Sequence, residues 1–262
     1  MTNGPPTAHA SMARILIISD LHANIEAFDA CLNAAPAYDR VWNLGDLVGY
    51  GASPNEVITL SRRIGDTFVR GNHDKACSGI VEPHDFNAAA AMSALWTRDQ
   101  LTPEHLEWVH DLPAGPITCD GFPAQLSHGS PFDEDHYLID VVDGCQTLAE
   151  ARVALNLFGH THIQGGFAEA DGKCFRIIPD YQSDTELEQW TFEMQPGAGY
   201  LINPGSIGQP RDGDFRAAFA LWLPQENSIT FYRVPYNIAG AQNKIRRAGL
   251  PEWLAHRLSL GR

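Results

Sequence analysis

A run of four aliphatic residues, followed at once by polar ones, constrains this chain most. Residues 15–18 read Ile-Leu-Ile-Ile, and Asp20 and His22 come directly after them. An uninterrupted aliphatic run of this length is typical of a β-strand buried on both faces. Open α/β sheets bind ligands at the carboxyl ends of their strands, which places Asp20 and His22 where chemistry is expected. By itself, an Asp at this position is as often the cap of the next helix.

The same transition from a strand to polar residues recurs twice in the next 60 residues or so. Strands are predicted over residues 40–44 and 66–70, and they lead into Gly45-Asp46 and into Gly71-Asn72-His73-Asp74. Helices are predicted between them, from the cap Asn24 to about residue 35 and over residues 55–64. Repeated βαβ units predict a parallel sheet, which brings the carboxyl ends of its strands to one edge.

The second half of the chain is richer in strands. A helical region with a break at 102–103 is predicted over residues 85–110, followed by a hairpin over residues 117–127. After a short helix at 146–151, strands are predicted at 153–158, 165–168, 173–178, 189–193, 199–202, 217–223 and 228–234, and a helix within 237–260. No repeat or linker interrupts this order, so we expect one α/β domain, close to the α+β class, over residues 13–262. Residues 1–12 contain Gly4-Pro5-Pro6 and are expected to form a disordered tail.

The charge and the cysteines limit the possible partners and compartment. The formal net charge is −14, which disfavours duplex nucleic acid and anionic membranes but leaves a small phosphorylated substrate possible. Because the sequence has neither an apolar run long enough to span a membrane nor a signal peptide, we expect a cytoplasmic protein. The five cysteines are scattered and form no C-x-x-C pair, so buried, reduced thiols are expected.

Polar residues at the predicted strand ends form one chemical set. Oxygen and nitrogen donors of this kind suit Mn²⁺, Fe²⁺ or Fe³⁺, Zn²⁺ or Co²⁺. Seven ligands and one further histidine exceed what a single tetrahedral ion needs, and they suit two ions that share a carboxylate. The set comprises Asp20, His22, Asp46, Asn72, His73, His128, His160 and His162.

The order of these motifs resembles the calcineurin-like metallophosphoesterase superfamily. Asp-x-His, Gly-Asp, Gly-Asn-His-Asp, an isolated His and Gly-His-x-His follow one another over residues 20–162. The loops at 44–51, 127–131 and 203–206 look like the small prokaryotic phosphodiesterase branch of that superfamily. This resemblance implies a four-layer αββα sandwich, in which two mixed β-sheets are flanked by helices.

The resemblance also implies the roles of individual residues. His73 would face the substrate as a catalytic residue and give a proton to the leaving group, and Asp74 would orient its ring. Two divalent ions are implied as cofactors. Their ligands would be Asp20, His22, Asp46 and His162 for the first ion, and Asp46, Asn72, His128 and His160 for the second, with Asp46 bridging the two.

The implied activity is hydrolysis of a small phosphodiester or phosphomonoester by a hydroxide that the two metal ions activate. Arg211 either clamps a phosphate or forms a surface ion pair, and Tyr50 and Tyr137 either stack on a nucleoside or pack at the rim. Alternative functions are a dinucleoside polyphosphate hydrolase of the diadenosine tetraphosphatase kind, a protein phosphatase and a non-catalytic scaffold. The sequence leaves the physiological substrate, the native metal and the oligomeric state open.

Overall fold

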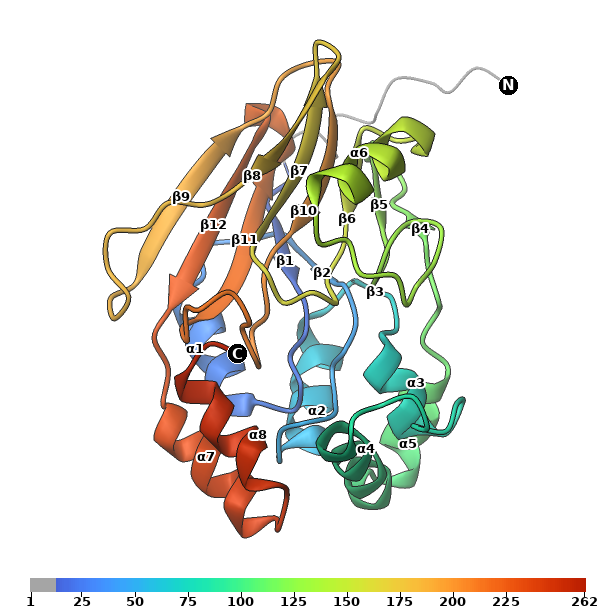
Figure 1. Cartoon of the computed structure of the whole chain (residues 1–262), viewed down its shortest axis with the longest axis vertical. Coiled ribbons are helices and arrows are strands. Elements are labelled where there is room, and N and C mark those ends of the chain that lie inside the picture. Colours follow the sequence, from blue (N-terminus) through green and yellow to red (C-terminus); the bar gives the residue numbers. More distant parts are fainter. Residues whose placement is uncertain (1–12) are drawn as a thin grey trace.

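Two mixed six-stranded β-sheets, packed face to face, form the centre of the computed structural model, which describes residues 13–262 (Figure 1). The tail predicted over residues 1–12 lies outside the described residues. The first sheet has the strand order β3-β2-β1-β11-β12-β9. Its strands are β1 (Ile15–Ile18), β2 (Arg40–Asn43), β3 (Thr67–Phe68), β9 (Glu188–Glu193), β11 (Ala217–Leu223) and β12 (Ser228–Val234).

Three parallel strands at one side of the first sheet confirm the predicted βαβ units. β1 pairs parallel with β2, with Ile18 opposite Asn43, and β2 pairs parallel with β3. On its other side β1 pairs antiparallel with β11, with Ile15 opposite Trp222, so the sheet as a whole is mixed. β3 is shorter than predicted because the Arg70 amide donates to the Pro113 carbonyl instead of continuing the ladder.

The second sheet has the strand order β4-β5-β6-β10-β7-β8. β5, β6 and β10 are parallel neighbours, and the remaining pairs are antiparallel, including the predicted hairpin of β4 and β5. Its strands are β4 (Ile117–Thr118), β5 (Ala124–Leu126), β6 (Leu155–Leu157), β7 (Gly165–Ala170), β8 (Lys173–Ile177) and β10 (Gly199–Asn203).

The aliphatic run of β1 divides between two cores, as the two-residue period of a strand requires. Ile15 and Ile17 belong to the core between the sheets, where Trp42 and Leu157 also lie. Leu16 and Ile18 belong to the outer core beneath the helices, together with Phe28. All four residues of β1 are buried, which confirms the prediction of a strand buried on both faces.

Helices cover the outer faces and complete four layers. α1 (Ile25–Ala34) and α2 (Pro54–Ile64) cover the first sheet, and α6 (Val141–Glu150) packs on β7 and β8 of the second. The predicted cap of α1 is confirmed, since the Asn24 side chain accepts a hydrogen bond from the Ala27 amide over 3.2 Å.

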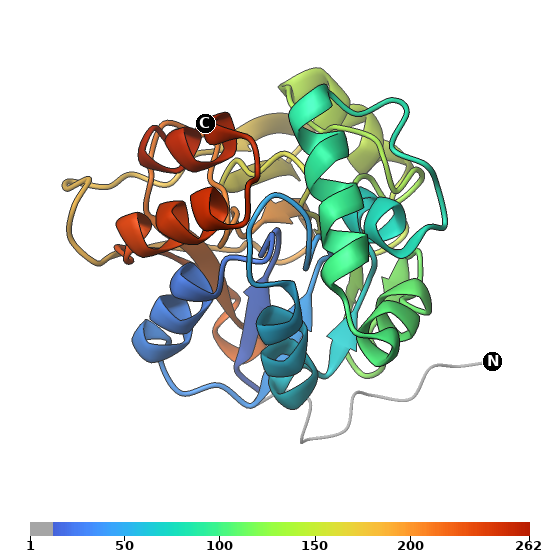
Figure 2. The same ribbon diagram turned by 90° about the horizontal axis from the view of Figure 1, so that it is seen from below.

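The remaining helices surround the carboxyl ends of β1, β2 and β3. The C-terminal segment divides into α7 (Ile238–Arg247) and α8 (Glu252–His256), and α7 packs against α1, as Figure 2 shows in red and blue. α3 (Asn72–Ser78), which the sequence did not predict, packs against α4 (Ala88–Gln100) and α5 (Pro103–His110).

One pair of cysteines departs from the sequence prediction. Cys145 on α6 and Cys174 on β8 form a disulfide, with their Cα atoms 5.9 Å apart. The prediction of five reduced thiols is wrong for this pair because the packing of α6 on β8 brings together residues 29 positions apart in the sequence. Cys31, Cys77 and Cys119 are free and buried. No helix in residues 13–262 is long and apolar enough to cross a membrane.

Candidate metal centre

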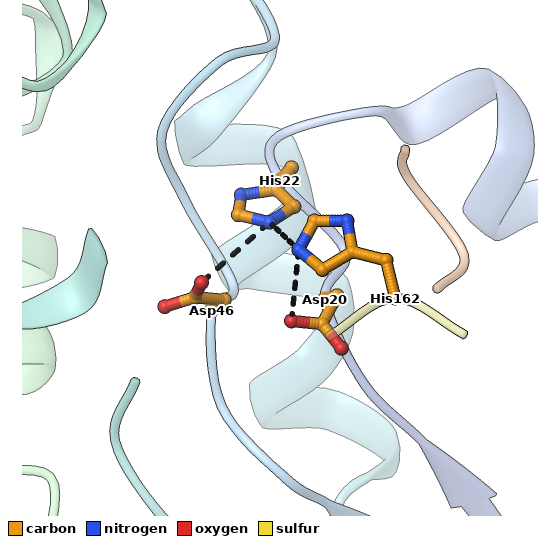
Figure 3. A group of neighbouring side chains, drawn as sticks. All are labelled: Asp20, His22, Asp46 and His162. Carbon is orange, nitrogen blue, oxygen red and sulfur yellow. Dashed lines mark hydrogen bonds and ion pairs between the residues drawn. The ribbon is translucent and has the colours of Figure 1, made fainter. Parts of the chain in front are cut away.

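Four of the predicted ligands converge on one point at the carboxyl ends of the strands (Figure 3). The Nε2 atoms of His22 and His162 lie 3.1 Å apart. His22 Nε2 is also 3.5 Å from Asp46 Oδ2, and His162 Nε2 is 3.3 Å from Asp20 Oδ1. All four side chains are buried and point toward one another, so the first predicted ligand set exists as a group.

A second group adjoins the first through Asp46. The Oδ2 atom of Asp46 lies 3.4 Å from Nε2 of His128, which in turn lies 3.1 Å from Nδ1 of His160. The donor atoms of these three residues all lie within 4.8 Å of one another. One carboxylate oxygen is therefore shared between the two groups, as a bridging ligand requires.

The side chain of Asn72 offers a buried oxygen in the neighbourhood of the second group. Asn72 begins α3 and borders the same cleft as His160. Its Oδ1 atom is buried and accepts no hydrogen bond from the described part of the chain. A buried acceptor without a partner costs about 1–3 kcal/mol, and a cation bound there would remove this cost. The donor set thus fits the two implied ions.

Backbone carbonyls fix which nitrogen each histidine presents to the centre. Three rings donate a hydrogen bond from Nδ1 to a backbone carbonyl. The pairs are His22 with Val48 (3.2 Å), His128 with Leu44 (2.8 Å) and His162 with Gln209 (2.6 Å). His160 is reversed: its Nε2 is bound to the Asp135 carbonyl over 3.0 Å, and Nδ1 faces the centre. A neutral ring that donates one N–H outward turns the lone pair of its other nitrogen inward, as metal ligation requires, and His128 would do so once its inward proton is lost.

The inward nitrogens of His22 and His162 present lone pairs to each other. Burial holds the pKa of both rings well below the usual range, so both are neutral, and the single proton of each is held by a carbonyl. Two nitrogen lone pairs 3.1 Å apart repel unless a cation lies beside them. This contact is a structural reason to expect a metal ion in the first group.

With no metal bound, His128 supplies the positive charge of the second group: its ring is protonated, and its inward Nε2 bears an N–H that faces Asp46 Oδ2. Burial alone would lower the pKa of His128, yet the carboxylates of Asp46 and Asp20 raise it to about 10. Burial alone would raise the pKa of Asp46, but His128 and His73 hold it well below the usual range. In the first group, the pKa of Asp20 is raised to about 7, chiefly by burial.

The loops that carry the ligands hold an unusual backbone conformation. Left-handed φ values are uncommon in residues other than glycine, cost about 1–3 kcal/mol each, and cluster at functional sites. Five of the seven predicted ligands adopt them: Asp20 (53°), His22 (45°), Asp46 (53°), His160 (65°) and His162 (59°).

Gly71 leaves room for the bridging carboxylate. A Cβ atom at this position would lie 2.0 Å from Asp46 Oδ1 and 2.6 Å from the Asp46 amide nitrogen. The same Oδ1 atom accepts the backbone N–H of His73 over 2.8 Å, which turns Oδ2 toward the ligand histidines. The Gly-Asp and Gly-Asn-His-Asp motifs therefore interlock through this contact.

His73 lies beside the metal centre, but Asp74 does not orient its ring. The carboxylate of Asp74 accepts backbone N–H groups from Gly71, Leu47 and Val48, and no hydrogen bond within residues 13–262 joins it to His73. The prediction for Asp74 is therefore wrong: its side chain points into the loop after β2 and fastens that loop to α3. The pKa of His73 is lowered to about 4, chiefly by burial.

A cleft of about 440 Å³ opens beside His73, Asn72 and His160. Tyr50 packs against His73 with ring centroids 4.2 Å apart, and Tyr137 against His160 at 3.7 Å. Phe86, which sequence reasoning missed, lies on His73 at 4.7 Å. No local motif marked Phe86, because its position depends on the path of the chain between α3 and α4.

Arg211 lies next to this centre. Its Nη2 atom donates to the Tyr50 hydroxyl over 3.3 Å and to Gln209 Oε1 over 3.0 Å. No carboxylate of residues 13–262 forms an ion pair with it, which excludes the predicted alternative of a surface ion pair within the described chain. Arg211 also acts on the pKa values of His73 and Asp20, so its charge is felt at the centre.

Comparisons with known proteins agree with this site. Residues 13–223 match the family model of the calcineurin-like phosphoesterase superfamily domain. The chain is 34% identical over 254 residues to the uncharacterised protein MJ0912 of Methanocaldococcus jannaschii, covering 95% of this chain and 98% of that protein. The crystal structure of a metallophosphoesterase from Sphaerobacter thermophilus is 37% identical with a TM-score of 0.79, covering 96% of this chain and 100% of that chain.

A more distant structure shares the fold. The hypothetical protein PH1004 of Pyrococcus horikoshii is 18% identical with a TM-score of 0.75, over 96% of this chain and 99% of that chain. The family model and the relatives above 30% identity cover the converging strand ends. The chain therefore belongs to the calcineurin-like phosphoesterase superfamily, and this membership supports a hydrolase of phosphate esters.

Proposed function

We propose that this protein hydrolyses a small phosphodiester or phosphomonoester at a dinuclear metal centre. One observation carries the proposal: a single oxygen, Asp46 Oδ2, lies 3.5 Å from His22 and 3.4 Å from His128, which belong to two different donor groups. A carboxylate in this position is suited to joining two ions. The adjoining cleft of about 440 Å³ has the size of a small-molecule site, which supports a small substrate over a protein.

The first ion would be held by Asp20, His22, Asp46 and His162. The second would be held by Asp46, Asn72, His128 and His160. Two such ions neutralise phosphoryl charge and lower the pKa of water. Ligands that are all oxygen or nitrogen favour Mn²⁺, Fe²⁺ or Fe³⁺, Zn²⁺ or Co²⁺ over softer metals.

Two further residues complete the proposed chemistry. Arg211 carries a guanidinium beside the centre and would bind the phosphoryl oxygens of the substrate. His73 lines the cleft and would hydrogen-bond to the leaving oxygen and give it a proton. Burial favours the neutral ring, but an anionic phosphate bound beside it raises the pKa of His73 and so favours the protonated form.

The cleft argues against the dinucleoside polyphosphate alternative. Its lining includes the acidic residues Glu82, Asp85 and Asp135, and its one lysine, Lys75, is already bound to carboxylates. Arg98 likewise pairs with Glu82, so the lining formed by the described residues offers no unpaired lysine or arginine to a leaving group with several phosphates. The complete donor sets argue against a scaffold without activity.

Turnover of bis-p-nitrophenyl phosphate and p-nitrophenyl phosphate, before and after chelation and Mn²⁺ addition, tests the proposal. We expect Mn²⁺ to restore activity in the wild-type protein but not in Asp46→Asn. His110→Ala, which changes an exposed histidine outside the centre, is the control and should be fully active. A wild-type protein that binds Mn²⁺ but hydrolyses neither substrate would refute the proposed reaction.

The role of His73 has its own test. We expect His73→Ala to lower kcat by roughly 10²–10⁴-fold on alkyl esters while leaving the metal content unchanged. The loss should be smaller on p-nitrophenyl esters, whose leaving group needs no proton. An equal loss on both kinds of ester would exclude proton donation by His73.

A further inference from the structure

The reversed ring of His160 is held by a loop that packs against it. Residues 129–137, here called the cover loop, follow His128 directly. His160 Nε2 is bound to the Asp135 carbonyl over 3.0 Å, and the ring of Tyr137 lies on the His160 ring with centroids 3.7 Å apart. The orientation of His160 is therefore only as secure as the position of this loop.

The cover loop folds tightly on itself. Ser130 accepts the backbone N–H groups of Phe132 and Asp133 through its hydroxyl. A Cβ atom at Gly129 would lie within 2.8 Å of the carbonyl oxygens of Asp133, Glu134 and His136, so the chain wraps closely around this glycine. These contacts tie residues 129–136 to one another, so the anchors of the loop also bear on where Asp135 lies.

The anchors are ion pairs to the segment that carries Asn72. Lys75 on α3 donates to both carboxylate oxygens of Asp135, at 2.7 and 2.6 Å, and to Glu134 Oε1 at 3.1 Å. Arg70, just before α3, binds Glu134 with two hydrogen bonds of 3.1 and 3.0 Å. The Lys75 side chain is 7% exposed and that of Glu134 is 23% exposed, so water weakens their contact little, whereas the Asp135 carboxylate is 53% exposed and its contact is weakened more.

Lys75 borders the cleft, yet it is not a free phosphate-binding group. An ammonium has three N–H donors, and three carboxylate oxygens already accept them. Its contacts join α3, which presents Asn72, to the loop that fixes His160. The first ligand group lies outside this network, since His22 and His162 are oriented by the carbonyls of Val48 and Gln209.

We propose that Lys75 is a positioning residue for the second metal ion: its ion pairs with Glu134 and Asp135 hold the cover loop so that His160 presents Nδ1 to that site. This inference rests on the proposed dinuclear centre. It predicts that removal of the ion pairs lowers the metal affinity of the second site and leaves that of the first site nearly unchanged. Loss of an outer hydrogen-bond partner of a metal ligand typically lowers metal affinity by about 10–100-fold.

Stepwise Mn²⁺ binding to the chelated protein tests the inference without relying on activity. Calorimetric titration gives the two affinities, and electron paramagnetic resonance separates a coupled Mn²⁺ pair from a single ion. In Lys75→Met we expect the second affinity to fall by about 10–100-fold and the coupled signal to be lost at low Mn²⁺, while the first affinity stays within roughly 3-fold. Lys75→Arg, which keeps the charge, should recover much of the loss.

Two more variants make the result decisive. Asp135→Asn keeps the main-chain carbonyl that His160 uses but weakens its ion pair, and we expect a smaller, selective loss; it also replaces Lys75→Met if that variant does not fold. Arg62→Met, which breaks the exposed Arg62–Glu104 pair, should change neither affinity. Equal weakening of both sites, or of neither, would overturn the role of Lys75. Wild-type protein that binds only one Mn²⁺ would refute the dinuclear centre itself.

Discussion

Removal of the metal ions should lower the thermal stability of this protein by a predictable amount. The centre contains two facing lone pairs 3.1 Å apart, a buried Asn72 oxygen without a hydrogen bond, and five ligand residues with left-handed φ values. Each of these features costs free energy in the metal-free folded state. Ions held at this centre would bind only the folded arrangement and would therefore stabilise it.

The size of the effect follows from binding linkage. An ion present at about 1,000 times its dissociation constant stabilises the folded state by about 4.1 kcal/mol. For a chain of this size, 1 kcal/mol corresponds to roughly 2–4 °C in Tm. One ion should therefore raise Tm by about 8–16 °C at saturating Mn²⁺, and a second ion should add to this shift.

Differential scanning calorimetry of the chelated protein, with and without Mn²⁺, measures the shift. Asp46→Asn is the matched variant because Asp46 is shared by both ligand groups. We expect its shift to be a small fraction of the wild-type value, whatever its own metal-free Tm. If Mn²⁺ left the wild-type Tm unchanged, or raised that of Asp46→Asn equally, the stabilisation would not come from this centre.

Three further predictions concern the surroundings of the centre. Gly71→Ala should lower Mn²⁺ content at both sites, because its Cβ would lie 2.0 Å from Asp46 Oδ1. The control is Gly199→Ala, whose Cβ would meet only ordinary contacts. Equal metal content in the two variants would contradict the reasoning. Asp74→Ala should lower the free energy of unfolding, measured in urea, by about 3 kcal/mol or more. Three buried backbone amides would lose their hydrogen-bond acceptor, and each loss costs about 1–3 kcal/mol. A decrease of less than about 1 kcal/mol would refute this reasoning. Burial raises the pKa of Glu134, but hydrogen bonds from Arg70 and Lys75 outweigh it, so the pKa is lowered in the folded state. The stability from these contacts is present above the unfolded pKa of about 4.5 and is lost as pH falls through the lower folded value. The wild type should therefore lose more stability on acidification than Glu134→Gln, and parallel curves of unfolding free energy against pH would contradict this.

The strands and the ligand set were predictable because they depend on local pattern. The aliphatic run before Asp20 gives a strand buried on both faces, and βαβ units send the residues after each strand to one edge of the sheet. The order of the motifs along the chain then predicted His128, His160 and His162 as ligands, and all three lie in the two donor groups.

The hydrogen bonds that hold the ligand side chains and their loops in place were not predictable in the same way. Asp74 lies next to His73 in the sequence, yet its carboxylate is taken up by amides, two of them more than 25 residues away. The reversed ring of His160 depends on the Asp135 carbonyl, 25 residues earlier. Such contacts are set by how loops cross in space, and no spacing of residues records them. The Cys145–Cys174 disulfide was missed for the same reason.

The origin of the ligands links metal binding to the assembly of the whole sandwich. Asp20, Asp46 and Asn72 follow β1, β2 and β3 of the first sheet, whereas His128 and His160 follow β5 and β6 of the second. Neither sheet alone carries a complete set of ligands for the second ion. The first set is also mixed, because His162 follows β6 of the second sheet, whereas its other members follow strands of the first sheet. Ions bound at these residues would therefore connect the two sheets at the edge of their shared core. Metal binding should for this reason oppose separation of the sheets, and hydrogen exchange of the β1 and β6 amides should slow together when Mn²⁺ is added.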